Sequence, residues 1–221
     1  MEGFALVPIL LFSVIVHEMA HGYMALKLGD PTAKDLGRLT FNPLPHIDPI
    51  GSILVPLVSY LAAGTVFIAW AKPVPINPAN FQNLRRDDIL VSVVGPFSNL
   101  LVALMCTIGY ILISQFIPTE GADVSGVEQM TFFLSDMMLM GITLNIYLAV
   151  FNMMPVPPLD GSHVVASLLP PALGEQYRRI GFFGILLILV LMRVDAVREA
   201  MASVVYVLLI PYQTIIQYFG G

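Results

Sequence analysis

The sequence predicts an all-α polytopic membrane protein, and three observations support this fold class. Of the 221 residues, 57% are hydrophobic and only 11% are charged, and the mean hydropathy is +0.83. A soluble domain carries about 25% charged residues, and a water-soluble globule could not bury so much apolar surface. Uncharged runs recur along the chain, and several reach the length of about 20 residues that a spanning helix needs. Soluble enzymes, disordered proteins and, with a net charge of -5, nucleic-acid-binding proteins are disfavoured.

About five apolar segments are predicted to span the membrane as helices. The first ends at Gly29-Asp30-Pro31, where a glycine and a proline stop a helix and begin a turn. The third ends in the proline-rich sequence 155–158, which cannot continue a helix. The predicted helices cover residues 4–28, 89–115, 131–153, 173–192 and 196–218.

The segments between the first two helices have a different composition. Residues 32–50 are polar and proline-rich, and we expect a short strand or hairpin at 35–42 on the membrane surface. Residues 49–71 form a further apolar run. Residues 72–78 contain too many prolines for a helix.

The first predicted helix contains a candidate metal-binding motif, His17-Glu18-Met19-Ala20-His21. Two histidines at positions i and i+4 share one helix face and are spaced to hold one zinc ion, and the intervening glutamate can act as a general base. A charged group at the centre of a membrane helix costs about 2.5–3.5 kcal/mol on the insertion scale, so such groups are usually functional. The alternative is a polar patch that only holds helices together.

Asp160 is the best candidate for a third ligand, because catalytic zinc takes three protein ligands and one open position. The prolines before it break the helix where an anionic side chain needs backbone freedom to turn inward. Gly161 permits backbone conformations that other residues avoid. Two alternatives remain: the prolines are only a helix stop, or His163 replaces Asp160 as the ligand.

Three motifs occur together in this sequence: His17-Glu18-x-x-His21, Gly95-Pro96-Phe97-Ser98-Asn99, and the run from Asn145 through Asn152 to Leu159-Asp160-Gly161. Together they resemble the site-2 protease family of intramembrane zinc metalloproteases, peptidase family M50, over about residues 10–165. The resemblance implies one Zn²⁺ ion per chain, and it implies the short form of the family without PDZ or CBS domains. A single membrane-embedded protease domain is expected over 1–221, with a site-2 protease-like catalytic core at 1–165 and two additional helices at 166–221.

The resemblance also assigns roles to individual residues. The zinc ion would be held by His17, His21 and Asp160, and Glu18 would activate the water molecule. Asn152 would contact the substrate or the oxyanion. The apolar run 49–71 departs from the family pattern, because it is an insertion between the motif helix and the Gly-Pro helix.

Charge and ligand geometry together predict how the 49–71 insertion lies in the membrane. If residues 49–71 span the membrane, five Lys and Arg residues lie on each side of it, and Asp160 lies far across the bilayer from the two histidines. If the segment bends near Gly64 and returns, the division becomes eight to two, and Asp160 reaches the depth of the histidines. Basic residues favour the cytoplasm. We therefore expect a re-entrant or partly buried hairpin at 49–71, an extracytoplasmic N-terminus and an active site toward the cytoplasmic face.

The predicted function is that of a zinc metalloendopeptidase in regulated intramembrane proteolysis, in a prokaryotic cell membrane. Its partners would be a transmembrane protein substrate and the lipid bilayer. One alternative is a catalytically silent relative that binds transmembrane helices. Another is a metal transporter, for which polar residues would be spread along a path rather than gathered at one depth.

Three further residues are predicted to bind substrate. A helical substrate hides its peptide bonds in its own hydrogen bonds, and pairing with a strand edge is one way to unwind it. Residues 36–41 are the candidate edge, with Leu39 and Phe41 as contacts. Asn145 shares a helix face with Asn152, and it either lines the same cleft or makes an interhelical hydrogen bond.

Overall fold

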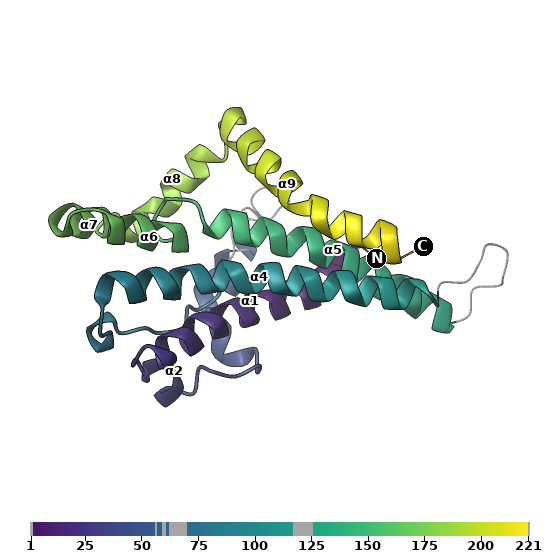
Figure 1. Ribbon diagram of the computed structural model, residues 1–221, viewed down its shortest axis with the longest axis horizontal. Coiled ribbons are helices and arrows are strands. Elements are labelled where there is room, and N and C mark those ends of the chain that lie inside the picture. The colour runs from purple at the N-terminus through teal and green to yellow at the C-terminus, as the bar shows by residue number, and fades with distance from the viewer. Residues whose placement is uncertain (1, 56, 59–60, 62–69, 117–125, 221) are drawn as a thin grey trace.

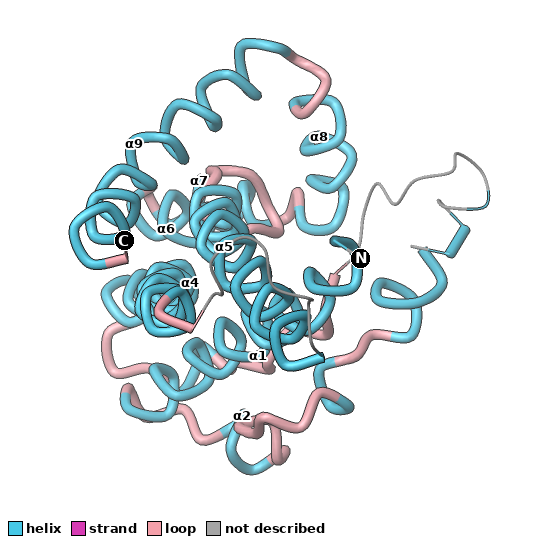
Figure 2. Tube along the Cα trace, turned by 90° about the vertical axis from the view of Figure 1, so that its right-hand side faces the viewer, coloured by secondary structure: helices cyan, strands magenta, loops and turns pink. Residues whose placement is uncertain are grey.

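The computed structural model describes residues 2–55, 57–58, 61, 70–116 and 126–220. Within these ranges every element of regular structure is a helix, and Figure 2 draws no strand in them. The all-helical class predicted from the sequence is therefore confirmed.

In the described part of the chain, four helices are long and apolar enough to cross a membrane: α1 (Glu2–Lys27), α4 (Leu84–Ser114), α5 (Gly126–Asn152) and α9 (Asp195–Phe219). They correspond to four of the five predicted spanning helices. α4 packs against both α1 and α5, and these three helices run side by side along the molecule, whereas α9 slants across α5 (Figure 1). Apolar side chains from all four helices meet in a buried core that includes Ile9, Val102, Ile142, Ile146 and Val205.

The prediction of one continuous helix at 173–192 is wrong. The structure divides this region into α7 (Pro171–Arg178), a 3₁₀ turn η4 (Gly181–Phe183) and α8 (Gly184–Leu191). α8 has only eight residues, about 12 Å at 1.5 Å per residue, which is less than the hydrocarbon core of about 30 Å. The helix breaks at Gly181, whose φ of 48° is in the left-handed region.

The predicted strand or hairpin at 35–42 is also wrong. A short helix, α2 (Thr32–Asp35), ends there, and the following N–H groups turn back onto it: those of Leu36 and Arg38 donate to Thr32 O (3.1 Å) and Ala33 O (2.9 Å). Because these groups close the helix end, they are not arranged along a strand edge. A 3₁₀ turn, η1 (Leu44–His46), follows.

The two described ends of the 49–71 segment lie against each other. The segment begins with a π-helical turn, η2 (Pro49–Leu54), which the Asp48 side chain caps by accepting from two N–H groups. Trp70 N–H donates to Gly51 O (3.1 Å), and the Ser52 hydroxyl donates to Trp70 O (2.8 Å). The chain thus returns to the point where it left, while the bend predicted near Gly64 lies outside the described residues.

Two shorter elements complete the arrangement around the site. A stretch without regular secondary structure leads from Trp70 to a 3₁₀ turn, η3 (Pro78–Asn80). The helix α6 (Asp160–Leu168) follows α5 after a proline-rich loop and packs against α4. Asp160 is the first residue of α6, so the proline-rich loop delivers it to the helix start.

Candidate metal centre

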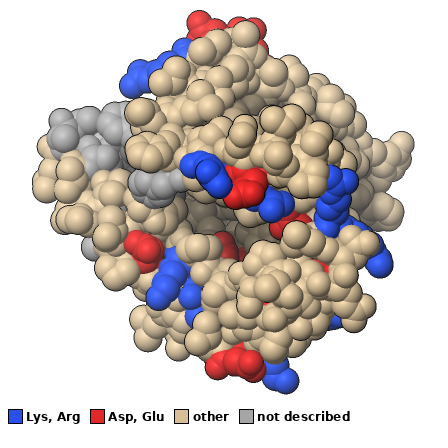
Figure 3. Space-filling view, turned by 90° about the vertical axis from the view of Figure 1, so that its left-hand side faces the viewer, with Lys and Arg blue, Asp and Glu red and all other residues tan. Residues whose placement is uncertain are grey.

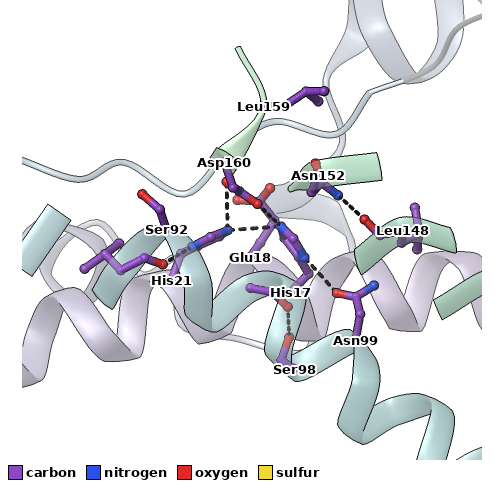
Figure 4. A network of polar contacts seen from close by, with 12 residues as sticks. His17, Glu18, His21, Ser92, Ser98, Asn99, Leu148, Asn152, Leu159 and Asp160 are labelled. Atoms are coloured by element: carbon purple, nitrogen blue, oxygen red, sulfur yellow. Dashed lines mark hydrogen bonds and ion pairs between the residues drawn. The ribbon is translucent and has the colours of Figure 1, made fainter. Parts of the chain in front are cut away.

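The structure brings His17, His21 and Asp160 together at one point. The two histidines lie on one face of α1, and Asp160 comes from the start of α6. His17 Nε2 lies 3.1 Å from Asp160 Oδ2, and His21 Nε2 lies 3.3 Å from Asp160 Oδ1. Figure 4 shows the two rings and the carboxylate pointing toward one another, and one donor atom from each residue lies within 4.8 Å of the others.

The hydrogen bonds of the two histidines decide which ring nitrogens are available to a metal. His21 Nδ1 contacts Val91 O at 2.7 Å, and a carbonyl oxygen only accepts, so Nδ1 carries the proton. His17 Nδ1 contacts Asn99 Oδ1 at 2.7 Å in the same way. Both Nε2 atoms are therefore left with lone pairs, and they face each other at 3.0 Å.

This donor set fits a single cation. Asp160 Oδ2 is buried and has no hydrogen-bond donor among the residues that the structure describes, and an unsatisfied buried carboxylate oxygen is costly. Three lone-pair atoms converge where a positive charge would satisfy all of them. Two imidazoles and one carboxylate, with room for a water molecule, are the ligand type of catalytic zinc sites.

The buried side-chain amides of Asn99 and Asn145 form a chain of hydrogen bonds that ends at His17. Asn99 on α4 accepts from His17 and donates through Nδ2 to Asn145 Oδ1 (3.3 Å), and Asn145 Nδ2 donates to Gly141 O (2.8 Å). Asn99 and Asn145 are both 0% exposed. The structure thus shows the interhelical hydrogen bond that the sequence left open for Asn145, and a direct contact of this residue with substrate stays a prediction.

The Gly95-Pro96 motif allows α4 to approach the histidines. A Cβ atom at Gly95 would lie 2.3 Å from His21 Nε2 and 2.8 Å from His17 Cε1, which is closer than real Cβ contacts come. Glycine at this position therefore leaves room for both imidazole rings.

The three candidate ligands lie at the wall of a cavity of about 710 Å³. Glu18 and Asn152 line the same cavity. Its wall includes apolar side chains such as Leu148 and Phe151 and polar ones such as Asp88 and His163. Figure 3 shows the molecule hollowed on the face at the α6–α7 end, with acidic and basic side chains around the hollow.

The family profile described as "Peptidase family M50" matches residues 5–192. The chain belongs to peptidase family M50. It is 38% identical over 194 residues to "Putative zinc metalloprotease YwhC" of Bacillus subtilis (strain 168), a match that covers 85% of this chain and 81% of YwhC. It is 26% identical over 196 residues to "Putative zinc metalloprotease Rip2" of Mycolicibacterium smegmatis, covering 89% of this chain and 69% of Rip2. No solved structure matches it.

Glu18 of this M50 peptidase is held by a backbone group. Its Oε2 accepts the N–H of Val74 at 2.7 Å. Asn152, the other residue with a predicted catalytic role, donates through Nδ2 to Leu148 O (3.0 Å) one turn earlier on α5. Both side chains reach the cavity, as the predicted roles require.

Leu39 and Phe41 lie on the segment that was expected to be a strand. Leu39 packs over α1, because its Cδ2 atom is 2.5 Å from the position of a Cβ atom at Gly22. Phe41 is 64% exposed and stacks on Phe12 with ring centroids 6.5 Å apart. Their contact with substrate stays a prediction, without a strand edge to support it.

The sequence did not single out a polar cluster beside the metal ligands. Asp88 is buried at the start of α4, and its Oδ2 accepts from the Ser167 hydroxyl (2.6 Å) and from Arg178 (2.7 Å). His163 Nδ1 lies 3.6 Å from Asp88 Oδ1, so His163 faces this cluster rather than the ligand set. The only signal in the sequence was the presence of charges so close to an apolar helix.

Proposed function

We propose that this M50 peptidase is an intramembrane zinc metalloendopeptidase that hydrolyses peptide bonds within or near transmembrane segments of membrane proteins. The observation that carries the proposal is the convergence of His17, His21 and Asp160 beside Glu18, on a helix long and apolar enough to span a membrane. One Zn²⁺ ion per chain would occupy this donor set.

The residues around the cavity supply the proton transfers of peptide hydrolysis. When bound, the cation acts as a Lewis acid on the scissile carbonyl and lowers the pKa of a water molecule. Glu18 has one carboxylate oxygen occupied by Val74 N–H; the other oxygen takes the proton from the water molecule and later delivers it to the leaving amine. Asn152 lines the cavity and would donate to the oxyanion or to the substrate backbone.

The proposed topology has the active site toward the cytoplasmic face of a bacterial cell membrane. α1 and α5 run in the same direction (Figure 1), so both approach the site with their C-terminal parts. The contact between Gly51 and Trp70 supports a re-entrant hairpin at 49–71. With this hairpin, Lys and Arg divide eight to two, which favours the side of Lys27 and Lys72 as the cytoplasmic side.

Cysteine accessibility tests this topology. Cys106 is buried, so we would replace it with serine and introduce single cysteines at Lys72 and Gly121. We expect an impermeant maleimide applied to intact cells to label Gly121→Cys and to leave Lys72→Cys unlabelled. Labelling of both positions from the same side would rule out the hairpin topology.

The activity is tested with Glu18→Gln in liposomes, using a single-span membrane protein as substrate. Glutamine keeps the size of the side chain but takes no proton, so we expect bound zinc to stay at one per chain while cleavage falls by at least about 1,000-fold. Glu199→Gln, an exposed change on α9, is the matched control. Wild-type protein that binds substrate but never cleaves it would favour a silent relative, and zinc flux through either protein would favour a transporter.

A further inference from the structure

We propose that the backbone N–H of Val74 is a positioning group for Glu18, and that Asp30 and Arg38 hold it in place. The segment concerned is the strap, which we define as residues 72–77, Lys-Pro-Val-Pro-Ile-Asn. The inference deepens the proposed function and rests on it, because it assigns a task to residues that no ligand motif contains.

The strap contacts Glu18, the proposed general base, directly. Val74 N–H donates to Glu18 Oε2 at 2.7 Å, and Val74 is 5% exposed. A glutamate side chain has three rotatable bonds, so a fixed donor on one oxygen selects one of its rotamers. The other oxygen is then presented in a constant position, which matters because small displacements of a reacting group can cost about 100-fold in rate.

Asp30 anchors the C-terminal end of the strap. Its Oδ2 accepts Asn77 N–H (2.7 Å), and its Oδ1 accepts from Asn80 Nδ2 (2.7 Å) and from Thr32 N–H (3.1 Å). Asp30 is 0% exposed, and a buried carboxylate stays ionised only where such donors surround it. The end of α1 is therefore tied to the strap through one fully buried side chain.

Arg38 anchors the N-terminal end. Its guanidinium donates to Lys72 O (2.8 Å) and Pro73 O (3.2 Å), and Arg38 is only 8% exposed. Lys72 N–H donates to His46 O (2.9 Å). The strap is thus held on both sides of Val74.

The surface of α1 is shaped to receive the strap. Gly22 lies one helical turn after Glu18 on the same face of α1. A Cβ atom there would lie 2.9 Å from Val74 Cγ1, so a larger residue at position 22 would clash with the Val74 side chain. Pro73 and Pro75 favour extended conformations at the residues that precede them, Lys72 and Val74. These features place the Val74 N–H group opposite Glu18.

Removing that N–H group tests the role in catalysis. Val74→Pro deletes the donor in a sequence that is already extended, whereas Val74→Ala keeps the donor and removes only side-chain packing. We expect the kcat of Val74→Pro to be about 10–100-fold below that of Val74→Ala, with equal zinc content and similar KM. Equal kcat in the two variants, or a loss of Val74→Pro confined to zinc content and thermal stability, would overturn the positioning role.

Amide hydrogen exchange tests the contact without any activity and without a Val74 variant. Prolines at 73 and 75 carry no N–H, so Val74 has no exchanging neighbour on either side. In Glu18→Ala we expect the Val74 amide to exchange at least about fivefold faster, while the Asn77 amide, which Asp30 holds, keeps its rate. An unchanged Val74 rate would overturn the proposal. If the exchange result is as expected but wild-type protein cleaves no substrate, the proposed function fails while the contact stands.

Discussion

The Nε2 atom of His17 lies 3.1 Å from the Oδ2 atom of Asp160, which joins the middle of α1 to the first residue of α6. No hydrogen bond forms across this distance, because the proton of His17 is on Nδ1, where it is donated to Asn99 Oδ1; no other donor among the described residues reaches Asp160 Oδ2. Two acceptors held face to face in a buried position are stabilised by a positive charge between them, which a bound metal cation would supply. The following predictions start from this relationship.

Removal of the carboxylate should abolish high-affinity metal binding. In Asp160→Ala only two imidazoles remain, and we expect bound zinc, measured by metal analysis of purified protein, to fall from one per chain to less than about 0.1. Asp195→Ala, an exposed change at the start of α9, should keep one zinc ion. Full zinc occupancy in Asp160→Ala would show that the ligand set is wrong.

The side-chain amide of Asn99, which accepts from His17, should affect the affinity of the site for zinc. Asn99→Leu removes the acceptor that fixes the His17 tautomer and leaves Asn145 short of a partner. We expect zinc affinity to fall by about 10–100-fold and the free energy of unfolding by about 1–3 kcal/mol, measured by competition with a chelator and by thermal unfolding.

Thr107→Val is the control for the Asn99 variant. It removes another buried hydrogen bond from α4, the one to Ala103 O (2.9 Å), away from the metal ligands. It should lower stability without changing zinc affinity. If both variants lose the same affinity, the effect belongs to α4 packing and not to His17.

Asp30 should make stability depend on pH in the acidic range. Burial alone would raise the pKa of this carboxyl, but the hydrogen bonds from Thr32, Asn77 and Asn80 outweigh burial and hold the pKa below its ordinary value of 3.8. A carboxyl group whose pKa is lower in the folded state stabilises the protein above its unfolded pKa and loses this effect as the pH falls toward the folded pKa.

Asp30→Asn isolates that contribution. We expect the variant to be less stable than wild type by about 2 kcal/mol at pH 7, and the gap to shrink as the pH falls below about 4. Thermal unfolding in detergent at several pH values measures both. A gap that is constant from pH 7 to pH 3 would contradict the ionised, hydrogen-bonded state of Asp30.

Arg178 should stabilise the start of α4 far more than its neighbour Arg179 stabilises α7. Arg178 contacts the buried Asp88, whereas Arg179 pairs with Glu175 on the surface of α7. We expect Arg178→Met to lower the free energy of unfolding by about 2–3 kcal/mol, because Asp88 loses a partner. Arg179→Met should change it by less than about 0.5 kcal/mol. Equal effects would mean that Asp88 is solvated rather than dependent on Arg178.

Much of the fold and most of the site could be predicted from the sequence. The length of the uncharged runs predicted α1, α4, α5 and α9, because a helix needs about 20 mostly apolar residues to span a bilayer. The spacing of His17 and His21 predicted a shared helix face, because a helix repeats every 3.6 residues. The same logic overestimated 173–192: only residues 180–192 of this segment lack charged side chains, which is too short a run to span a bilayer, and the structure divides the segment into α7, η4 and α8.

The residues that the sequence did not identify act through contacts distant in the chain. In the sequence, Asp30, Asp88 and Arg38 look like charged residues of loops and helix ends. They hold segments together only because the fold buries them against other parts of the chain.

The sequence by itself determined the four long apolar helices and the candidate ligands, because hydrophobic length and side-chain chemistry are local properties. The tertiary structure alone decided that Val74 N–H meets Glu18 and that Asn99 orients His17. A backbone N–H is common to every residue except proline, so its partner becomes visible only when packing brings two distant segments together.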